Sequence, residues 1–196
     1  MSPRPNVSEE RTRQIIEAAT LVFAQKGFDR ATMDDIAAAA GINKATIYLY
    51  FKNKDALIIA IAEQIFALEL ADLQRACELP GAAAQRLGAF YETLIAEKAN
   101  FLPLMPIFYE FYALGLRRDD VRAALLSFME QSAALLQGII EEGVSAGEFA
   151  PLDAQKTAKT FIALLDGIMM QWAYNPRLDV DAQLRFGVQL LLQGLG

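Results

Sequence analysis

Apolar residues recur at intervals of three and four along almost the whole chain, which is the spacing of one face of an α-helix. Sustained alternation of apolar and polar residues, the pattern of a half-buried strand, does not occur in the sequence. The pattern therefore predicts an all-α protein.

Glycine, proline and capping residues divide this pattern into about nine helices. Thr32 and Asn53 are expected to cap the second and fourth helices. The fourth helix is long, and Pro80 and Gly81 interrupt the chain after it. We expect it to bridge two domains, residues 1–54 and 55–196. The helices are predicted at about 8–26, 32–41, 43–51, 54–77, 82–99, 103–116, 119–146, 153–174 and 180–195.

Composition limits the class of protein. The chain has 196 residues, 54% of them hydrophobic, so it can bury a sizeable core. No uninterrupted apolar run approaches the roughly 20 residues of a membrane span, and we expect a cytoplasmic protein without a membrane partner. Histidine is absent and Cys77 is the single cysteine, which excludes an internal disulfide, a histidine-based triad and the usual zinc ligand sets. No cofactor or metal is expected.

Charge is distributed unevenly along the chain. The net charge is −6, but residues 1–54 contain eight Lys or Arg against six Asp or Glu, whereas the rest contains ten against eighteen. An acidic body behind a mildly basic head would direct a polyanion to the head.

The most informative segment runs from Thr32 to Lys54 and reads TMDDIAAAAGINKATIYLYFKNK. Thr32 and Asp35 form an approximate capping box at the start of a short helix. Small residues on its packing side, a tight Gly41-Ile42 turn and a second short helix match a helix-turn-helix, whose second helix enters the major groove of DNA. The small residues are Ala37, Ala38 and Ala40.

The spacing in this segment separates core from surface. Ile36, Ile42, Ile47 and Phe51 are expected to form a small core. Polar side chains between them are left to face outward and donate hydrogen bonds to phosphates or bases. These are Asn43, Lys44, Thr46, Tyr48 and Tyr50.

At these residues the chain resembles the TetR family of transcriptional regulators. The family pattern is a small-residue helix, a Gly-Val or Gly-Ile turn, and a run of the type Ser-Lys-Gly-Thr-Leu-Tyr-Tyr-Tyr-Phe-Lys-Asn-Lys-Glu, which residues 42–55 follow closely in residue type. The resemblance in motif covers about residues 8–60, and the helical remainder is consistent with the family's nine-helix plan. It implies a ligand-responsive regulator, by default a repressor, that binds a palindromic operator as a homodimer.

The resemblance also implies DNA contacts. Thr32 and Lys54 are expected to hold phosphates, and Lys44, Thr46 and Tyr48 to contact backbone or base edges. Two positions depart from the family pattern: Ala45 replaces a glycine and Leu49 replaces an aromatic residue. Tyr48 and Tyr50 have an alternative role in packing against the first helix. The full expected set is Thr32, Asn43, Lys44, Ala45, Thr46, Tyr48, Leu49, Tyr50 and Lys54.

A dimer is expected, because one head reads only a few base pairs and specific recognition needs two. The family resemblance implies that the last two helices form its interface. Gly167 lies beside their apolar stripes and would allow close helix approach, or is an ordinary core glycine. The expected interface residues are Phe161, Leu164, Gly167, Ile168, Leu184, Val188, Leu191 and Leu192.

An aromatic-rich stretch lies between the bridging helix and the last two helices, and the family resemblance implies that it encloses the site of a small, largely apolar effector. The same residues would also serve as plain core. The expected lining is Phe90, Leu94, Met105, Phe108, Tyr109, Tyr112, Phe128, Gln131 and Trp172.

Two other functions stay open. In a small helical enzyme, Glu110 or Asp166 would act as acid or base, but no nucleophile motif or glycine-rich phosphate loop accompanies them, and we expect no enzyme. The second alternative is an interaction protein that keeps the fold without binding DNA. Leu49 and the modest charge of the head favour it.

Overall fold

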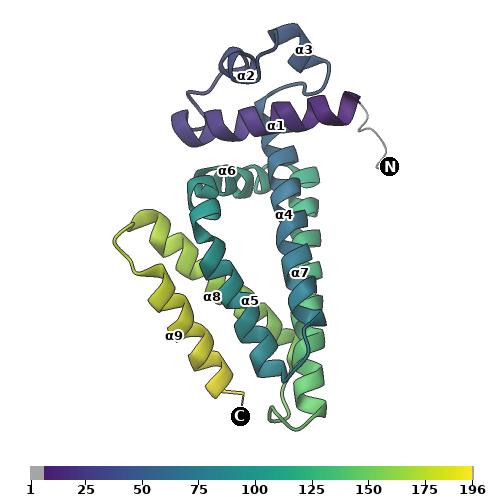
Figure 1. Ribbon diagram of the computed structural model, residues 1–196, viewed down its shortest axis with the longest axis vertical. Coiled ribbons are helices and arrows are strands. Elements are labelled where there is room, and N and C mark those ends of the chain that lie inside the picture. The colour runs from purple at the N-terminus through teal and green to yellow at the C-terminus, as the bar shows by residue number, and fades with distance from the viewer. Residues whose placement is uncertain (1–6, 196) are drawn as a thin grey trace. The chain divides into compact units, whose positions relative to one another are not determined.

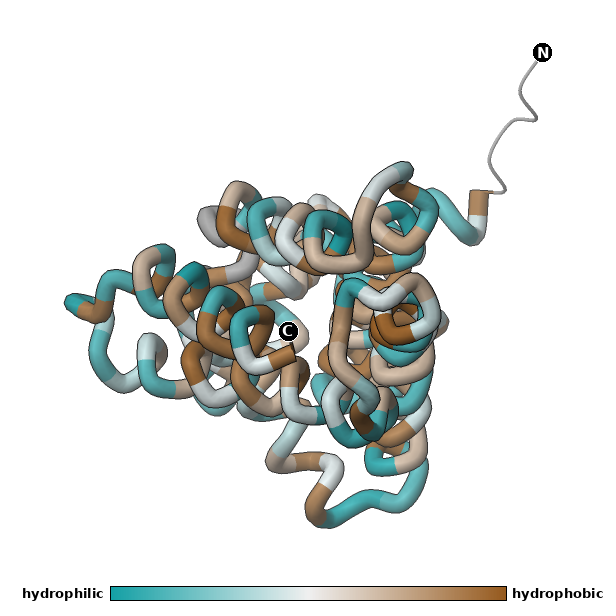
Figure 2. The backbone as a smooth tube through the Cα atoms, turned by 90° about the horizontal axis from the view of Figure 1, so that it is seen from below, coloured by the Kyte–Doolittle hydropathy of each residue, from teal (hydrophilic) through white to brown (hydrophobic). Residues whose placement is uncertain are grey.

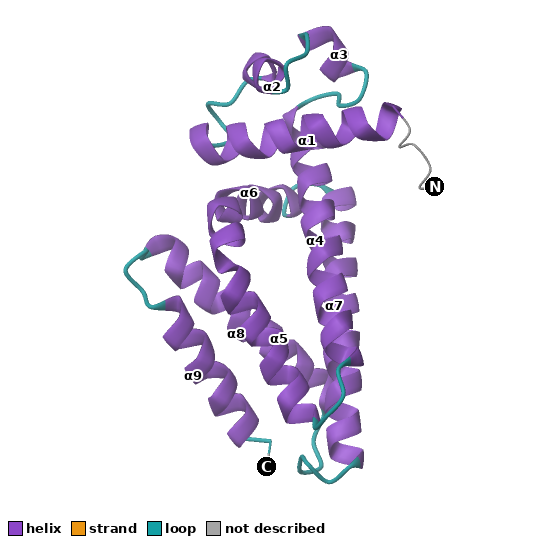
Figure 3. Ribbon diagram, viewed as in Figure 1, coloured by secondary structure: helices purple, strands orange, loops and turns teal. Residues whose placement is uncertain are grey.

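The computed structural model describes residues 7–195, apart from the side chains of residues 98–101 and 103. All regular structure within this range is helical, as Figure 3 shows, which confirms the predicted fold class. The described residues form nine α-helices and one short 3-10 helix. In chain order these are α1 (Val7–Lys26), α2 (Met33–Ala39), α3 (Lys44–Tyr48), α4 (Lys54–Glu78), α5 (Ala83–Phe101), η1 (Leu102–Leu104), α6 (Met105–Gly115), α7 (Asp119–Ser145), α8 (Ala154–Tyr174) and α9 (Val180–Gln193).

Several predicted helix boundaries differ from the observed ones by up to three residues, and the third and sixth helices are examples. The prediction that the third helix reaches Phe51 was wrong, because the backbone N–H groups of Tyr50 and Phe51 both donate to the Ile47 carbonyl, each at 2.9 Å, and the chain turns there. The sixth helix begins at Met105 instead of 103, preceded by η1. Pro106 lies in its first turn, where a backbone N–H has no helical partner.

The chain divides into two compact units. Among the described residues the first comprises 7–66 and 100–125, and the second comprises 67–99 and 126–195. Packing therefore groups the start of α4, together with η1 and α6, with the predicted DNA-binding head, although the expected functional division lies after residue 54.

The first unit is organised around α1, which packs against α2 on one side and against η1 and α6 on another (Figure 1). Its buried face carries Ile15, Ala19 and Phe23 at helical spacing. The first turn of α4 is held by an ion pair of 3.4 Å between Asp55 and Arg118, which lies in the turn between α6 and α7. These contacts fix α1 and the start of α4. In turn, α1 packs against α2, and α2 packs against α3.

The second unit contains the α8–α9 hairpin and two apolar clusters. The larger cluster joins Leu73 of α4, Tyr91 of α5 and Phe161 of α8, and the smaller one contains Ile168 and Leu184. Hydrophobic and hydrophilic residues follow one another along each helix in Figure 2, as expected for helices with one buried face.

One helix, α7, is long and apolar enough to cross a membrane by length and composition. Its residues Leu136, Ile139 and Ile140 are buried in the larger cluster of the second unit. A core helix of a soluble protein passes the same test, and these three side chains belong to the core.

Candidate nucleic-acid interface

The start of α2 is built by a capping box. The backbone N–H of Asp35 donates to Thr32 Oγ1 at 3.1 Å, and the backbone N–H of Thr32 donates to Asp35 Oδ2 at 3.0 Å. Lys26 also donates to Asp35, at 2.6 Å, and it is the main reason why the pKa of Asp35 falls to about 2. The predicted cap is confirmed, and the hydroxyl of Thr32 is engaged within it.

The turn after α2 depends on glycine. Gly41 has a φ of 65°, in the left-handed region that favours glycine, although no atom would obstruct a side chain there. The N–H of Gly41 donates to the Ala38 carbonyl at 3.2 Å and that of Ile42 to the Ala37 carbonyl at 3.0 Å. This pair of bonds is a Schellman motif, which satisfies the last carbonyls of α2 and redirects the chain into α3.

Asn43 caps α3. Its side-chain oxygen accepts from the backbone N–H of Thr46 at 2.8 Å and from the Thr46 hydroxyl at 2.9 Å. Two residues predicted to face outward are therefore occupied in holding the helix start, and Thr46 is half-buried.

The predicted small core forms around α2 and α3. Ile36 and Ile47 are fully buried, and Phe51 is 8% exposed, whereas Ile42 is half-buried. Ala37 and Ala40 are buried, but the expectation that Ala38 packs inward was wrong. At about 100° per residue, Ala38 lies away from the face that Ile36, Ala37 and Ala40 share.

The outer face of α3 carries most of the residues that the sequence indicated for DNA contact. Tyr48 is 46% exposed and Leu49 is 83% exposed, and Tyr50 is half-buried. Asn43, Lys44 and Ala45 are also exposed. The fold thus exposes a row of side chains on the surface of the helix-turn-helix, while Ile47 is buried and Thr46 is half-buried. The exposed row consists of Asn43, Lys44, Ala45, Tyr48 and Leu49.

Two acidic residues of α2 hold lysines of the head in ion pairs. Lys44 donates to Asp34 at 2.8 Å, which raises the pKa of the lysine, and Lys26 pairs with Asp35. The Lys44–Asp34 pair is exposed on the same surface as Tyr48, so a phosphate would compete with Asp34 for this ammonium. Sequence spacing did not reveal the pair, because its partners are ten residues apart.

Lys54 is engaged within the protein. Its ammonium donates to the carbonyl oxygens of Phe28 at 2.6 Å and Asp29 at 3.3 Å, and it lies 4.5 Å from the centre of the Phe28 ring. Lys52 is exposed two residues earlier and forms no ion pair among the described residues. Sequence reasoning overlooked Lys52; its position directly after the buried Phe51 was the available signal.

The residues expected at a dimer interface are mainly buried inside the protomer. Phe161, Ile168, Leu184 and Val188 are at most 5% exposed and pack in the two clusters of the second unit. Leu164, Gly167, Leu191 and Leu192 are half-buried. The α8–α9 pair instead exposes other large apolar side chains, which sequence reasoning overlooked because they lie outside the regular stripes. These are Met170, Tyr174, Phe186 and Leu190.

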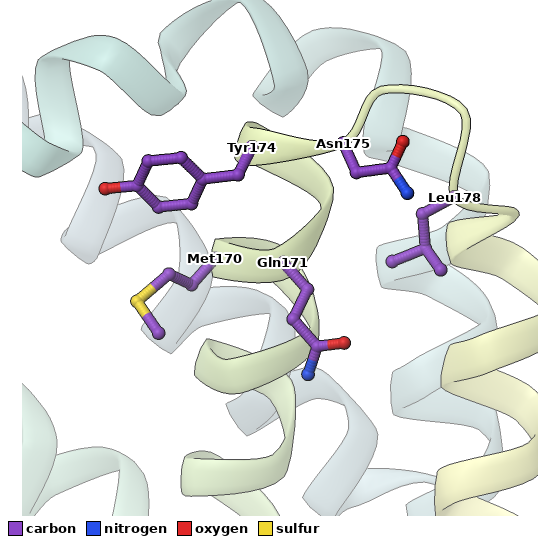
Figure 4. A pocket seen from close by; sticks show the side chains of 5 residues that line it. All are labelled: Met170, Gln171, Tyr174, Asn175 and Leu178. Atoms are coloured by element: carbon purple, nitrogen blue, oxygen red, sulfur yellow. The ribbon is translucent and has the colours of Figure 1, made fainter.

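A pocket of about 310 Å³ lies where α8 ends and turns toward α9 (Figure 4). Met170, Gln171 and Tyr174 contribute from α8, and Asn175 and Leu178 contribute from the connection. Two of these residues belong to the exposed apolar set. The pocket is therefore part of the same surface.

The residues expected to line an effector site divide between the two units. In the first, Met105 and Phe108 are buried, and Tyr109 and Tyr112 are half-buried. In the second, Phe90 is buried, and Leu94, Phe128 and Trp172 are half-buried. Gln131 is exposed and donates to Ser127 at 3.1 Å.

Family models match most of the chain. The model described as bacterial regulatory proteins, tetR family, matches residues 15–61, which contain α2 and α3. A second model, BetI-type transcriptional repressor, C-terminal, matches residues 80–193.

Individual proteins align over most of their length. The uncharacterized HTH-type transcriptional regulator YfiR of Bacillus subtilis is 27% identical over 92% of this chain and 90% of its own. The HTH-type transcriptional regulator RutR of Escherichia coli O157:H7 is 30% identical over 78% of this chain and 70% of its own. The structure of the transcriptional regulator FadR from Bacillus subtilis in complex with stearoyl-CoA has a TM-score of 0.74 at 25% identity, covering 94% of this chain and 99% of that one.

The glycine-dependent turn, the exposed face of α3 and the matches over both parts of the chain lead to one assignment. The protein belongs to the TetR family of bacterial transcriptional regulators, with a C-terminal part of BetI type.

Proposed function

We propose that this regulator is a repressor that binds a palindromic operator as a homodimer and is released by a small effector with a largely apolar body. The exposed row on α3 carries the proposal. Tyr48 and Leu49 expose large side chains beside Lys44, while Ile47 anchors the helix in the core. Exposed aromatic and basic groups on a short, rigid helix suit insertion into the major groove.

Phosphate contacts are assigned to the cations that flank this row. Lys52 is exposed and has no ion-pair partner among the described residues, so it approaches a phosphate without breaking an existing contact. Lys54 would have to leave two carbonyl oxygens first. We therefore assign a larger share of the phosphate attraction to Lys52 than to Lys54, and Lys44 contributes when a phosphate displaces Asp34.

A second copy of the chain is proposed to cover the exposed apolar face of the second unit. Phe186 is 62% exposed and Leu190 is 59% exposed on α9, and Met170 and Tyr174 extend this face along α8. An added side chain at Gly167 would meet no atom within 4 Å, so this side of α8 leaves room for another helix. Large exposed apolar patches mark interaction sites, and a second copy of the chain is the partner proposed here.

The proposed response to an effector has two grounds. The second unit contains many aromatic and aliphatic side chains, and one of the relatives binds a small molecule. The FadR structure from Bacillus subtilis is that of a complex with stearoyl-CoA. A ligand weakens DNA binding here only if it favours a body conformation that spaces the two heads badly. The helix α4 runs from the head unit into the second unit and is the element that would transmit such a change.

The test is fluorescence anisotropy of the full chain titrated onto DNA from upstream of its own gene and onto scrambled DNA, at two salt concentrations. Lys52→Ala should weaken binding to both DNAs and reduce the salt dependence by about one counterion. Tyr48→Ala should weaken binding to the upstream DNA more than to the scrambled DNA. Lys159→Ala is the matched control, because Lys159 is exposed on α8 and forms no ion pair among the described residues.

Equal affinity for the two DNAs, unchanged by Tyr48→Ala, would contradict sequence-specific binding. No binding to upstream or genomic fragments, including after unfolding and refolding to remove a carried-over ligand, would favour an interaction protein that keeps the fold.

A further inference from the structure

A highly exposed apolar side chain lies at the end of α3. Leu49 is 83% exposed, and its backbone still has helical dihedral angles, with a φ of −71° and a ψ of −25°. A single exposed leucine is common on protein surfaces and needs no explanation by itself. What distinguishes Leu49 is the direction in which α3 presents it and the engagement of the polar side chains around it.

Ala45 and Leu49 lie on the side of α3 that points away from the protein core. Ile47 is fully buried and fixes the inward side of the helix. At about 100° per residue, Ala45 and Leu49 each lie about 160° from Ile47 and only about 40° from each other. Ala45 is exposed as well. The two side chains therefore form one apolar surface on the outermost side of α3.

Polar side chains of α3 and its cap are engaged inside the head. The side-chain oxygen of Asn43 accepts from the backbone N–H of Thr46 at 2.8 Å and from the Thr46 hydroxyl at 2.9 Å. The ammonium of Lys44 donates to Asp34 at 2.8 Å. These contacts would have to break before Asn43 could accept a hydrogen bond from adenine, or Lys44 could donate to guanine. Residues 41–50 contain no arginine, the other side chain that commonly reads guanine.

Thymine complements the surface that remains. In the major groove its C5 methyl group is the apolar element of the base-pair pattern, and apolar side chains contact it directly. The other three bases present hydrogen-bond donors and acceptors there. An apolar surface on the outermost side of a recognition helix therefore favours thymine over the other bases.

We propose that Ala45 and Leu49 are specificity-determining residues that read thymine methyl groups, so that each half of the operator presents thymines to α3. This inference rests on the proposed function, because it requires DNA binding through this helix. At about 1.5 Å per residue, the two positions are about 6 Å apart along the helix axis, and successive base pairs are about 3.4 Å apart. The thymines that they contact therefore lie at most about two base-pair steps apart.

The experiment removes only the methyl group from the base, because uracil pairs with adenine as thymine does but has no C5 methyl group. The specific fragment is the DNA that the full chain binds most tightly, from upstream of its gene or from elsewhere in the genome. This fragment and a scrambled fragment of the same composition are each prepared with thymine and with uracil throughout. Fluorescence anisotropy measures the affinity for all four.

Replacing thymine by uracil should weaken binding to the specific fragment by about tenfold or more, because both half-sites lose methyl contacts. Binding to the scrambled fragment should change by less than about twofold, although the same number of methyl groups is removed, because phosphate attraction dominates there.

Substitutions assign the effect to the side chain. Leu49→Ala should weaken binding to the specific thymine fragment by about fivefold and reduce the loss caused by uracil to less than about threefold. Leu49→Met keeps a long apolar side chain and should restore most of the thymine preference. Leu116→Ala is the matched control, because Leu116 is 82% exposed in the turn between α6 and α7, outside the helix-turn-helix. Circular dichroism of each variant confirms that it is folded.

An affinity of the wild type for the specific fragment that uracil leaves unchanged would overturn the inference. An equal loss in the wild type and in Leu49→Ala would also overturn it, because the methyl groups would then act through the shape of the DNA. Equal affinity for the specific and scrambled thymine fragments would refute the proposed function and the inference with it, whereas specific binding that tolerates uracil refutes the inference alone.

Discussion

At the scale of single residues, ion pairs within the head reduce the positive charge that it presents to DNA. Lys44 lies on the exposed row of α3 but donates to Asp34, and Lys26 donates to Asp35. The Lys44–Asp34 pair is largely exposed and therefore weak, so its main effect is on the charge that the surface presents. Asp34 lowers the positive potential at the place where phosphate is expected.

Asp34→Asn should strengthen DNA binding by about twofold to fivefold at low salt, because Lys44 no longer has to exchange a carboxylate for a phosphate. Anisotropy titrations at low and at physiological salt would measure the change, which should shrink as salt increases. Asp29→Asn removes the same charge from the head without touching Lys44 and is the control. An equal gain in the two variants would mean that only net charge matters.

Glu69 makes stability depend on pH. Burial first, and the charge of Asp166 second, raise the pKa of this α4 side chain to about 7 in the folded protein from near 4.5 in the unfolded chain. The folded state therefore holds this proton more tightly, so stability is greatest below pH 4.5, falls between pH 4.5 and 7, and is constant above. Because Glu69 is partly accessible, we expect Glu69→Gln to raise the free energy of unfolding at pH 8 by only about 1–2 kcal/mol.

Urea denaturation at pH 5 and pH 8, at one fixed protein concentration, measures this effect. The wild type should lose more stability over that interval than Glu69→Gln, and a smaller loss should persist in the variant because burial also raises the pKa of Asp166. Parallel pH curves for the two proteins would show that Glu69 titrates normally.

At the scale of elements, close packing at one point of α7 depends on a glycine. A side chain at Gly143 would overlap the ring of Phe149, which is 5% exposed, and would lie 2.9 Å from Ala83 at the start of α5. Five residues earlier on the same helix, Gly138 has no atom within 4 Å of the corresponding position. The two glycines share a helix but differ in what surrounds them.

Gly143→Ala should destabilise the protein by about 1–3 kcal/mol, because the neighbouring ring is held in the core and must move. Gly138→Ala should stabilise it by about 0.5–1 kcal/mol, since alanine has the higher helix propensity and meets open space. Thermal and urea denaturation of the two variants would compare them. A stabilising Gly143→Ala would show that Phe149 moves aside at no cost.

At the scale of the whole molecule, the exposed apolar face of α8 and α9 is the proposed interface of a homodimer. Phe186 and Leu190 on α9 and Met170 and Tyr174 on α8 leave this surface uncovered within one protomer. Two heads are also needed to read a palindromic operator, so assembly and DNA recognition are expected to fail together.

Phe186→Glu combined with Leu190→Glu should convert a dimer to a monomer, because charges would be buried against apolar side chains without partners. Size-exclusion chromatography with light scattering measures the mass, and anisotropy should show a loss of specific DNA binding of about tenfold or more. Leu68→Glu and Leu126→Glu, at residues that are 58% and 52% exposed on α4 and α7, are the controls. A dimer that survives the double substitution would place the interface elsewhere.

The sequence by itself determined the helical class, the order of the helices and the helix-turn-helix. These follow from local causes: apolar spacing of 3.6 residues, caps such as Thr32 and Asn53, and the left-handed turn that only Gly41 adopts readily. The outer face of α3 was predictable for the same reason, because Ile47 and Phe51 fix which side of a short helix is buried.

The tertiary structure alone decided which apolar and charged residues find partners. The stripes of α8 and α9 proved to be core of the protomer at Phe161, Ile168 and Leu184, since a stripe shows that a face is buried but not against what. The ammonium of Lys54 donates to backbone carbonyls 25 and 26 residues away, and Arg185 of α9 pairs with Glu92 of α5 across 93 residues. Such pairings depend on how helices pack in three dimensions, and spacing along the sequence does not predict them.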